Sequence, residues 1–499
     1  MSIVAAFTDH QLDKYSLLEK VLESARFFEI LEQAWSNSGK EKKDFKIALK
    51  ASISMMLRRN DVGIYTDPFL VIHLLRLILK RGYQNLAVVE SRNLYGNWFQ
   101  NRAVIQIAAR AGYFEESIIK SGEEEKSRNI LVKGDGVNAR VPLIDLSLDT
   151  VLHNFGDPVG QILVGKTWTE ADFRINLAKM KTHFYSCYTL AIKNIYGCLP
   201  IQDKVRAYHC QRKVGPWTAQ LIKSFPVHFS IVDGYSSADG WLGVKIKAIA
   251  VKSHTIIAGA DILAVDHYGA GILRVKPERS VLYTSLAKLV PFKNYQVAGN
   301  AVSPKPWRNS PYFFTLFCRL IEANSNIMDF SGALATGGYD PCFPHARTNR
   351  GILKKFLYYL TVPANFLSDL GVARLRIREG RFQRTFKKQA EKIPLLAGSD
   401  FILSRLTLLS AKDLEILTEI LDQGLGPEIT FSGHYLFLKN REIPFPSRLT
   451  TANLAAVEIL KEIQARKLDS RAFSDELRKL PKLFPSFYAP DNPYPYCYR

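Results

Sequence analysis

Residues 176–197 read Asn-Leu-Ala-Lys-Met-Lys-Thr-His-Phe-Tyr-Ser-Cys-Tyr-Thr-Leu-Ala-Ile-Lys-Asn-Ile-Tyr-Gly, and this stretch decides the fold. It places Lys179, Lys181 and Lys193 among residues that are mostly apolar or aromatic. Such a segment should be buried, and a buried lysine normally needs an anionic partner. If its first part is a strand, Lys179, Lys181 and His183 point to one face because side chains alternate. The pattern predicts a cationic row beside an apolar row, as in a pocket for an anionic group.

Strands and helices are expected to alternate on both sides of this stretch. Asp67-Pro68 has the residue types of a helix N-cap and first helical position. Apolar spacing predicts helices at 68–79 and 99–111 and strands at 45–49, 86–90, 161–165, 173–176, 229–232 and 255–258, with a helix from Asp261 to Leu273. This alternation predicts an α/β fold with a mainly parallel sheet flanked by helices, and polar residues cluster at the carboxyl ends of its strands.

The chain is long enough for several domains. Its 499 residues exceed what one hydrophobic core normally holds. We expect a helical segment at 1–43 with one helix over 11–35, an α/β domain at 44–299, and a C-terminal extension at 300–499. A proline-rich change of composition near 300–311 marks the second boundary, and helices at 411–422 and 451–466 make the extension α-rich.

The composition indicates which binding partners and which cellular compartment to expect. The chain has 67 basic and 47 acidic residues, a formal charge of +20, which favours anionic partners. Its six cysteines include no C-x-x-C pair, which argues against a disulfide framework and favours a reducing, cytoplasmic compartment. No apolar run reaches the length of a membrane span, so no integral membrane segment is expected.

Five residues of the opening stretch are candidates for binding and catalysis. Lysine supplies a compact charge suited to phosphate or carboxylate, so Lys179, Lys181 and Lys193 are expected to bind an anion, with Lys181 also a catalytic candidate. Asn194 would orient the ligand, and His183 would exchange a proton. The alternative is a strand edge with solvated lysines and a structural histidine.

Two aspartates are candidates for holding a divalent cation. Asp233 follows an apolar strand, and Asp266 lies among apolar residues of the helix that Asp261 begins. Carboxylates at strand ends bind Mg²⁺ or Mn²⁺ or orient a lysine. The alternative for Asp233 is a turn aspartate before glycine, whereas Asp261 fits a plain N-cap.

A second basic segment is a candidate for nucleic-acid binding. Residues 374–388 hold many basic side chains and few acidic ones, and Phe382 and Phe386 are interleaved with them. Arg374, Arg376 and Arg378 would share one face of a strand and, with Lys388, track a phosphate backbone while the phenylalanines stack on bases. A solvated basic hairpin, or a face that docks an acidic protein, is the alternative.

The chain resembles a known family, domain of unknown function 362. The resemblance rests on Thr66-Asp-Pro68, Ile175-Asn-Leu-Ala-Lys-Met-Lys-Thr-His183, Ile192-Lys-Asn-Ile-Tyr-Gly197, Ile231-Val-Asp-Gly234 and Asp261-Ile-Leu-Ala-Val-Asp266. It covers about residues 44–275 and implies an α/β domain in which Lys50 and Asp67 join the substrate-binding candidates. Of the family's I-K-P-N after the first strand, only Lys50 is kept. Some members carry ferredoxin-like cysteine clusters, and this chain lacks that spacing, which argues against an iron–sulfur cluster.

These observations lead to two hypotheses. The first is an enzyme that binds an anionic small molecule through a Lys/His/Asp site, stabilising negative charge that develops in the reaction. The second is a basic protein that binds nucleic acid or an acidic partner through residues 374–388. The sequence does not define the substrate, the cofactor or the oligomeric state.

Overall fold

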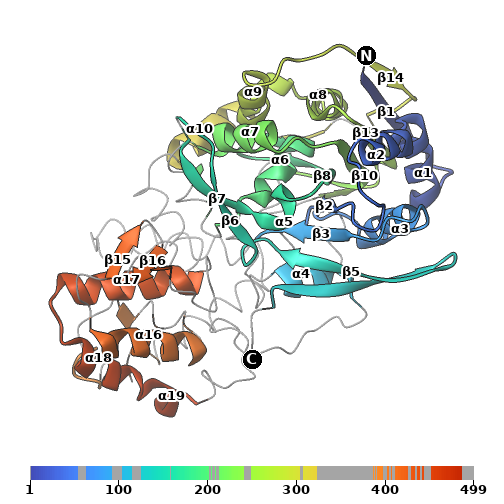
Figure 1. Cartoon of the computed structure of the whole chain (residues 1–499). Coiled ribbons are helices and arrows are strands. Elements are labelled where there is room, and N and C mark those ends of the chain that lie inside the picture. The colour runs from blue at the N-terminus through green and yellow to red at the C-terminus, as the bar shows by residue number, and fades with distance from the viewer. Residues whose placement is uncertain are drawn as a thin grey trace.

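The centre of the protein is an eleven-stranded sheet between two layers of helices (Figure 1). The computed structural model describes residues 2–53, 63–92, 104–114, 125–157, 159–201, 204, 208–209, 213–240, 249–303, 307–322 and parts of 386–485. Within these residues no helix is both long enough and apolar enough to cross a membrane. The predicted α/β class is confirmed.

The sheet is mainly parallel, as the sequence predicted. Strands β10, β8, β2, β3 and β5 all run in the same direction. The order is β14 (Tyr295–Ala298), β1 (Ser2–Thr8), β13 (Thr255–Gly259), β10 (Phe229–Asp239), β8 (Phe173–His183), β2 (Ile47–Ala51), β3 (Leu86–Glu90), β5 (Val137–Asp145) and β4 (Ser127–Gly134). Outside this order β9 (Cys187–Thr189) pairs with β8, β12 (Ile249–Val251) with β10, and β6 (Thr150–Asn154) with β7 (Gln161–Gly165).

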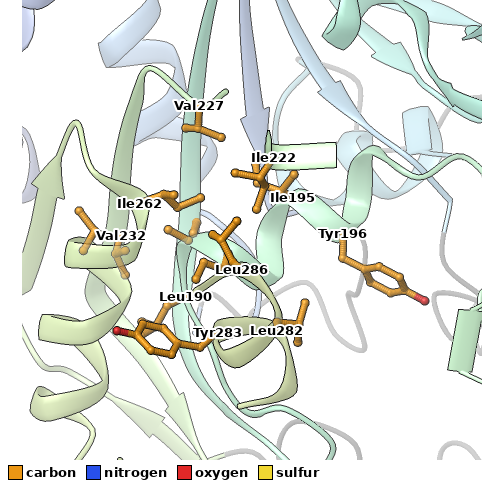
Figure 2. Packing of buried hydrophobic residues seen from close by; sticks show 14 of the residues in the cluster. Leu190, Ile195, Tyr196, Ile222, Val227, Val232, Ile262, Leu282, Tyr283 and Leu286 are labelled. Atoms are coloured by element: carbon orange, nitrogen blue, oxygen red, sulfur yellow. The ribbon is translucent and has the colours of Figure 1, made fainter. Parts of the chain in front are cut away.

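Alternating side chains of the strands bury two separate faces. Ile47 and Leu49 of β2 pack on the face covered by α1 (Lys14–Ser24), α2 (Phe27–Ser36), α3 (Pro68–Leu79) and α4 (Val104–Ala111). Ala48 packs on the opposite face, under α5 (Lys166–Thr169), α6 (Ala191–Ile195), α7 (Val214–Ser224), α8 (Ile262–Ile272) and α9 (Val281–Ala287). Figure 2 shows part of this second layer, where side chains of α6, α7 and α9 meet.

The helix starts follow the predicted capping. Asp67 accepts a hydrogen bond from the Phe69 amide and Pro68 takes the first position of α3. Asp261 caps α8 in the same way, accepting from the amides of Leu263 and Ala264. Both predicted caps are confirmed.

The N-terminal segment differs from the prediction of one helix over 11–35. Two helices form instead, because Arg26 between them has φ 56°, a left-handed conformation that ends α1 before α2 begins. The segment also starts with β1, which the sequence analysis did not predict. Its seven residues, Ser2–Thr8, are too short for a clear periodic pattern.

The direction of β13 corrects a second expectation. We expected its carboxyl end beside that of β10, yet β13 runs antiparallel to β10, with Asp233 opposite Ile256. The reason is that β12 turns back along the end of β10, pairing Ser237 with Val251. A parallel pair would need a longer crossover connection.

The C-terminal part has its own hydrophobic cluster, with Leu417, Ile459 and Leu477 at its centre. The expected helices are confirmed as α16 (Ala411–Gln423) and α17 (Thr451–Ala465), and β15 (Ile429–Ser432) pairs antiparallel with β16 (Tyr435–Leu438). The remaining elements are α10 (Tyr312–Glu322), β17 (Arg441–Glu442), α18 (Ser470–Leu477), α19 (Leu480–Leu483) and the short turns Tyr196–Cys198 and Pro277–Arg279.

We predict that Gly259→Ala destabilises the protein. A Cβ at Gly259 would lie 2.7 Å from the carbonyl oxygen of Ile3, a backbone atom of the paired strand β1 that cannot move alone. The overpacking should lower the free energy of unfolding by about 1–3 kcal/mol, measured by urea denaturation of the full chain. Gly271→Ala is the control, because nothing lies within 4 Å of its Cβ on exposed α8 surface. Equal stability of Gly259→Ala and the parent would contradict the close β1–β13 contact.

Candidate functional site

The most deeply buried part of the candidate site is an ion pair between two parallel strands. Lys179 of β8 lies opposite Asp233 of β10, and its Nζ is 2.7 Å from Asp233 Oδ2. The two side chains are 0% and 1% exposed. By strand alternation both lie on the face covered by α1–α4. The predicted cation therefore lies in the sheet, and Asp233 neutralises it.

Asp67 joins this pair through its backbone. Its amide donates to Asp233 Oδ2 at 3.1 Å, so the N-terminus of α3 also stabilises that carboxylate. The carboxylate of Asp67 itself caps α3 and forms an ion pair with Lys14 at 2.5 Å. Substrate binding by Asp67 stays a prediction, and its present contacts hold α3 against the site.

Lys181 lies two residues further along β8, on the same face as Lys179. Its Nζ donates to the Ile64 carbonyl at 2.7 Å, and it forms no ion pair with a carboxylate of the described residues. The side chain is almost wholly buried, at 6% exposure of the residue. Burial, together with the smaller effects of the positive charges of Lys193 and Lys179, lowers the pKa of Lys181 to about 7.

His183 ends β8 and is partly exposed. Its Nδ1 accepts from the amides of Tyr185 and Ser186, at 3.0 and 3.3 Å. A ring nitrogen that accepts carries no proton, so the neutral ring holds its proton on Nε2. His183 is therefore arranged as a donor through Nε2, and the predicted role as a base is less suited to this arrangement.

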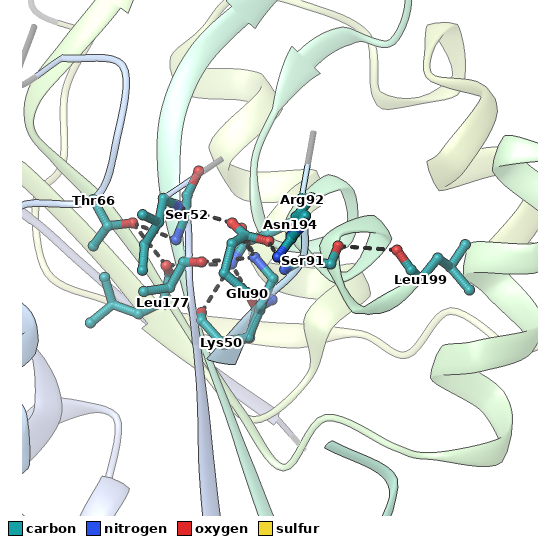
Figure 3. A network of polar contacts seen from close by, with 12 residues as sticks. Lys50, Ser52, Thr66, Glu90, Ser91, Arg92, Leu177, Asn194 and Leu199 are labelled. Carbon is teal, nitrogen blue, oxygen red and sulfur yellow. Dashed lines mark hydrogen bonds and ion pairs between the residues drawn. The ribbon is translucent and has the colours of Figure 1, made fainter. Parts of the chain in front are cut away.

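A second buried ion pair occupies the other face of the sheet, under α6 (Figure 3). Lys50 at the end of β2 has its Nζ 3.0 Å from Glu90 Oε2 at the end of β3, and both side chains are 1% exposed. Asn194 of α6 accepts from Lys50 Nζ at 3.1 Å and donates to the Asn176 side chain at 2.8 Å. Lys50 and Asn194 thus come together, as the sequence motifs led us to expect for one site.

Glycine at position 197 is required by this second pair. A Cβ there would lie 2.6 Å from Lys50 Cε, so any larger residue would collide with the ion pair. The glycine ends the stretch 192–197, whose Asn194 contacts the same lysine. The spacing of this motif therefore reflects packing of α6 over Lys50 and Glu90.

Lys193 points differently from its neighbour Asn194. It is partly exposed, and its Nζ lies 4.2 Å from the centre of the Tyr196 ring, a cation–π distance. Its charge contributes to the lowered pKa of Lys181. Lys193 therefore belongs to the group of ammonium groups around Lys181, although it comes from the opposite face of the sheet.

Two charged residues of this region were missed by the sequence analysis. Neither Glu90 nor Lys204 is among the candidates predicted from the sequence. Lys204 is buried, with Nζ donating to Ser91 Oγ at 2.9 Å and to the Leu199 carbonyl, and burial lowers the pKa of Lys204 to about 7. The position of Glu90 after four apolar residues was the only available signal, and Lys204 lies in no motif.

Asp266 does not meet Asp233, because β13 is antiparallel and α8 starts at the other end of the sheet. Its carboxylate accepts from the Ile192 amide at 3.1 Å, at the start of α6, and burial raises its pKa to about 7. In the described part of the chain, no three His, Cys, Asp or Glu side chains form a group that could hold a metal ion. The divalent cation stays a prediction of the sequence.

The structure describes two residues of the basic segment 374–388, Phe386 and Lys388. Arg374, Arg376 and Arg378 lie outside the described residues. Lys388 is described, and it is helical and exposed. Nucleic-acid binding through these residues stays a prediction.

Residues 47–271 match the model of a family described as domain of unknown function (DUF362). A thylakoid-associated protein, sll1697, of Synechocystis sp. (strain ATCC 27184 / PCC 6803 / Kazusa) is 26% identical over 154 residues, 28% of this chain. The chain spans about half the length of this relative, 46%. No solved structure matches. The match over residues 47–271 therefore confirms the resemblance to the DUF362 family that the motifs predicted.

Proposed function

We propose that this protein is an enzyme that binds an anionic small molecule at the carboxyl ends of β8 and β10, with Lys181 in contact with the ligand. The observation that carries the proposal is the environment of Lys181, a buried amine whose hydrogen-bond acceptor is the neutral carbonyl group of Ile64. A buried charge without a compensating carboxylate is costly, and an anionic ligand would supply the missing partner.

The neighbours of Lys181 support an anion rather than a cation. Lys179 and Lys50 are already neutralised by Asp233 and Glu90, so these pairs leave no net charge. Lys181 adds positive charge at the carboxyl end of β8 when it is protonated, and the charge of Lys193 on α6 acts on the same amine. Open α/β sheets place ligands outside the carboxyl ends of their strands, where these groups lie.

The roles follow from the contacts. Lys181 and Lys193 would bind the phosphate or carboxylate, and Lys179 would stay paired with Asp233 beneath them. His183 would donate from Nε2 to a ligand oxygen, because Nδ1 is already used as an acceptor. Asn194 would orient Lys50 rather than touch the ligand. Negative charge developing in a reaction would be stabilised by these preorganised donors.

The alternative, binding of nucleic acid or an acidic protein through residues 374–388, has no contact in the described residues that favours it. A cytoplasmic location likewise stays a prediction. The name of the relative, a thylakoid-associated protein, belongs to that protein.

We predict that Lys181→Met weakens anion binding. A panel of phosphorylated and carboxylated metabolites should include one that raises the unfolding midpoint of the parent, and calorimetry should then give its Kd. Loss of a charge-assisted hydrogen bond should raise that Kd by about tenfold to a hundredfold. Lys223→Met is the matched control, because Lys223 lies exposed on α7 and the net charge changes equally. If Lys181→Met and the parent bind the metabolite with equal affinity, the proposal is ruled out.

We also predict that Lys181 makes stability depend on pH. The folded protein holds this amine with a pKa of about 7, whereas an unfolded lysine has about 10.4. Between these values the unfolded chain binds more protons, so the free energy of unfolding rises with pH, by at most about 1.4 kcal/mol per pH unit for one group. Urea denaturation from pH 7 to 10 should give a shallower rise for Lys181→Met than for the parent or Lys223→Met. Identical slopes would show that Lys181 is not held neutral.

A further inference from the structure

The amine of Lys181 has unused capacity. A protonated lysine offers three N–H donors, and a neutral one offers two N–H donors and a lone pair. Lys181 uses one donor, to the Ile64 carbonyl. Lys179 and Lys50, by contrast, are each held by a carboxylate, at 2.7 and 3.0 Å. Lys181 is therefore the lysine of β8 whose nitrogen can form a new bond.

Its position along β8 is near the end of the strand. Lys179 is 0% exposed and Lys181 is 6% exposed, whereas His183, two residues further, is partly exposed. The Lys181 amine therefore lies between a fully buried ion pair and the partly exposed end of β8, from which a ligand would approach it.

We propose that the Lys181 amine is a nucleophile that forms an imine with a small oxo acid, in which a ketone or aldehyde carbon is adjacent to a carboxylate. This rests on the proposed function, because Lys193 and Lys181 itself must first attract the carboxylate. Lysines become nucleophilic when they are desolvated or lie beside another cationic group. Lys181 is buried at the end of β8, and the charge of Lys193 acts on its amine.

The step needs no oxidant or metal. The nitrogen lone pair of the neutral amine attacks the carbonyl carbon, and an amine proton moves to the carbonyl oxygen, which gives a carbinolamine. The hydroxyl group then takes up a proton and leaves as water, while the nitrogen lone pair forms the C=N bond. The product is a cationic imine that withdraws electrons from the neighbouring carbon atoms. His183 Nε2–H would hydrogen-bond to the oxygen that leaves.

Lys204 shows that burial alone does not make a lysine a candidate nucleophile. Its amine is as deeply buried as that of Lys181, but it is enclosed by Ser91 Oγ and the Leu199 carbonyl, and its nearest charges include Glu90 and Asp145. We assign Lys204 a structural role, holding Ser91 against Leu199. It serves as an internal reference in the same molecule.

The test is to trap the imine on the full chain. The parent is incubated at pH 7 with pyruvate and sodium cyanoborohydride, and the reduced adduct is located by peptide mass spectrometry over time. At this pH about half of the Lys181 amines are neutral, against on the order of one in a thousand for an exposed lysine. We expect Lys181 to be labelled at least about tenfold faster than Lys223, and Lys204 to stay unlabelled. Lactate, a carboxylate without the carbonyl, should slow the labelling of Lys181 alone.

The outcomes separate this proposal from the proposed function. Lys181→Arg keeps the charge and should bind lactate while forming no adduct at that position. If lactate binds the parent but Lys181 is labelled no faster than Lys223, the imine is ruled out and anion binding stands. If neither lactate nor pyruvate binds and no selective adduct forms, both proposals are overturned. Because the mapping uses the parent, the result does not depend on whether a variant folds.

Discussion

The compensation of buried ammonium groups is the constraint on which the centre of this structure depends. Lys179 and Lys50 are almost inaccessible to solvent, and each is held by a carboxylate from the neighbouring parallel strand. Removing one partner of such a pair typically costs about 3–5 kcal/mol, since the other charge stays buried and unpaired. Each pair also fixes strand order, because Asp233 must lie beside β8 and Glu90 beside β2. The geometry of the candidate site therefore depends on the order and register of these strands.

The same constraint distinguishes Lys181 from the two lysines that are paired with carboxylates. Two carboxylates compensate two lysines, and the next lysine along β8 has a carbonyl as its acceptor. With a lowered pKa, its amine avoids the cost of a buried charge by releasing its proton near neutral pH. An anion that entered would reverse this, because a nearby negative charge favours the protonated form. Ligand charge and protonation of Lys181 are therefore coupled, and a carbonyl compound would react with the neutral form that burial favours.

Local pattern was enough to predict much of this arrangement. The period of two in β8 placed Lys179 and Lys181 on one face, and Asp67-Pro68 and Asp261 marked helix starts, because capping and alternation act over a few residues. Pairing between distant strands could not be predicted in this way. The antiparallel β13 depends on the return through β12, and it separates Asp266 from Asp233. The contacts of Glu90 and Lys204 could not be predicted from local pattern, since neither residue lies in a motif with the residues it contacts.

The stretch 192–197 illustrates how a short motif can serve two faces of a sheet. Asp266 accepts from the Ile192 amide and holds the start of α6. Asn194 then faces inward to Lys50, while Lys193 faces the Tyr196 ring and influences Lys181. Gly197 leaves room for the Lys50–Glu90 pair. These contacts come from one short helix. A shift of α6 would therefore change both the hydrogen bond that orients Lys50 and the distance from the Lys193 charge to Lys181. The motif is therefore best understood as a rigid link between the structural ion pair and the reactive lysine.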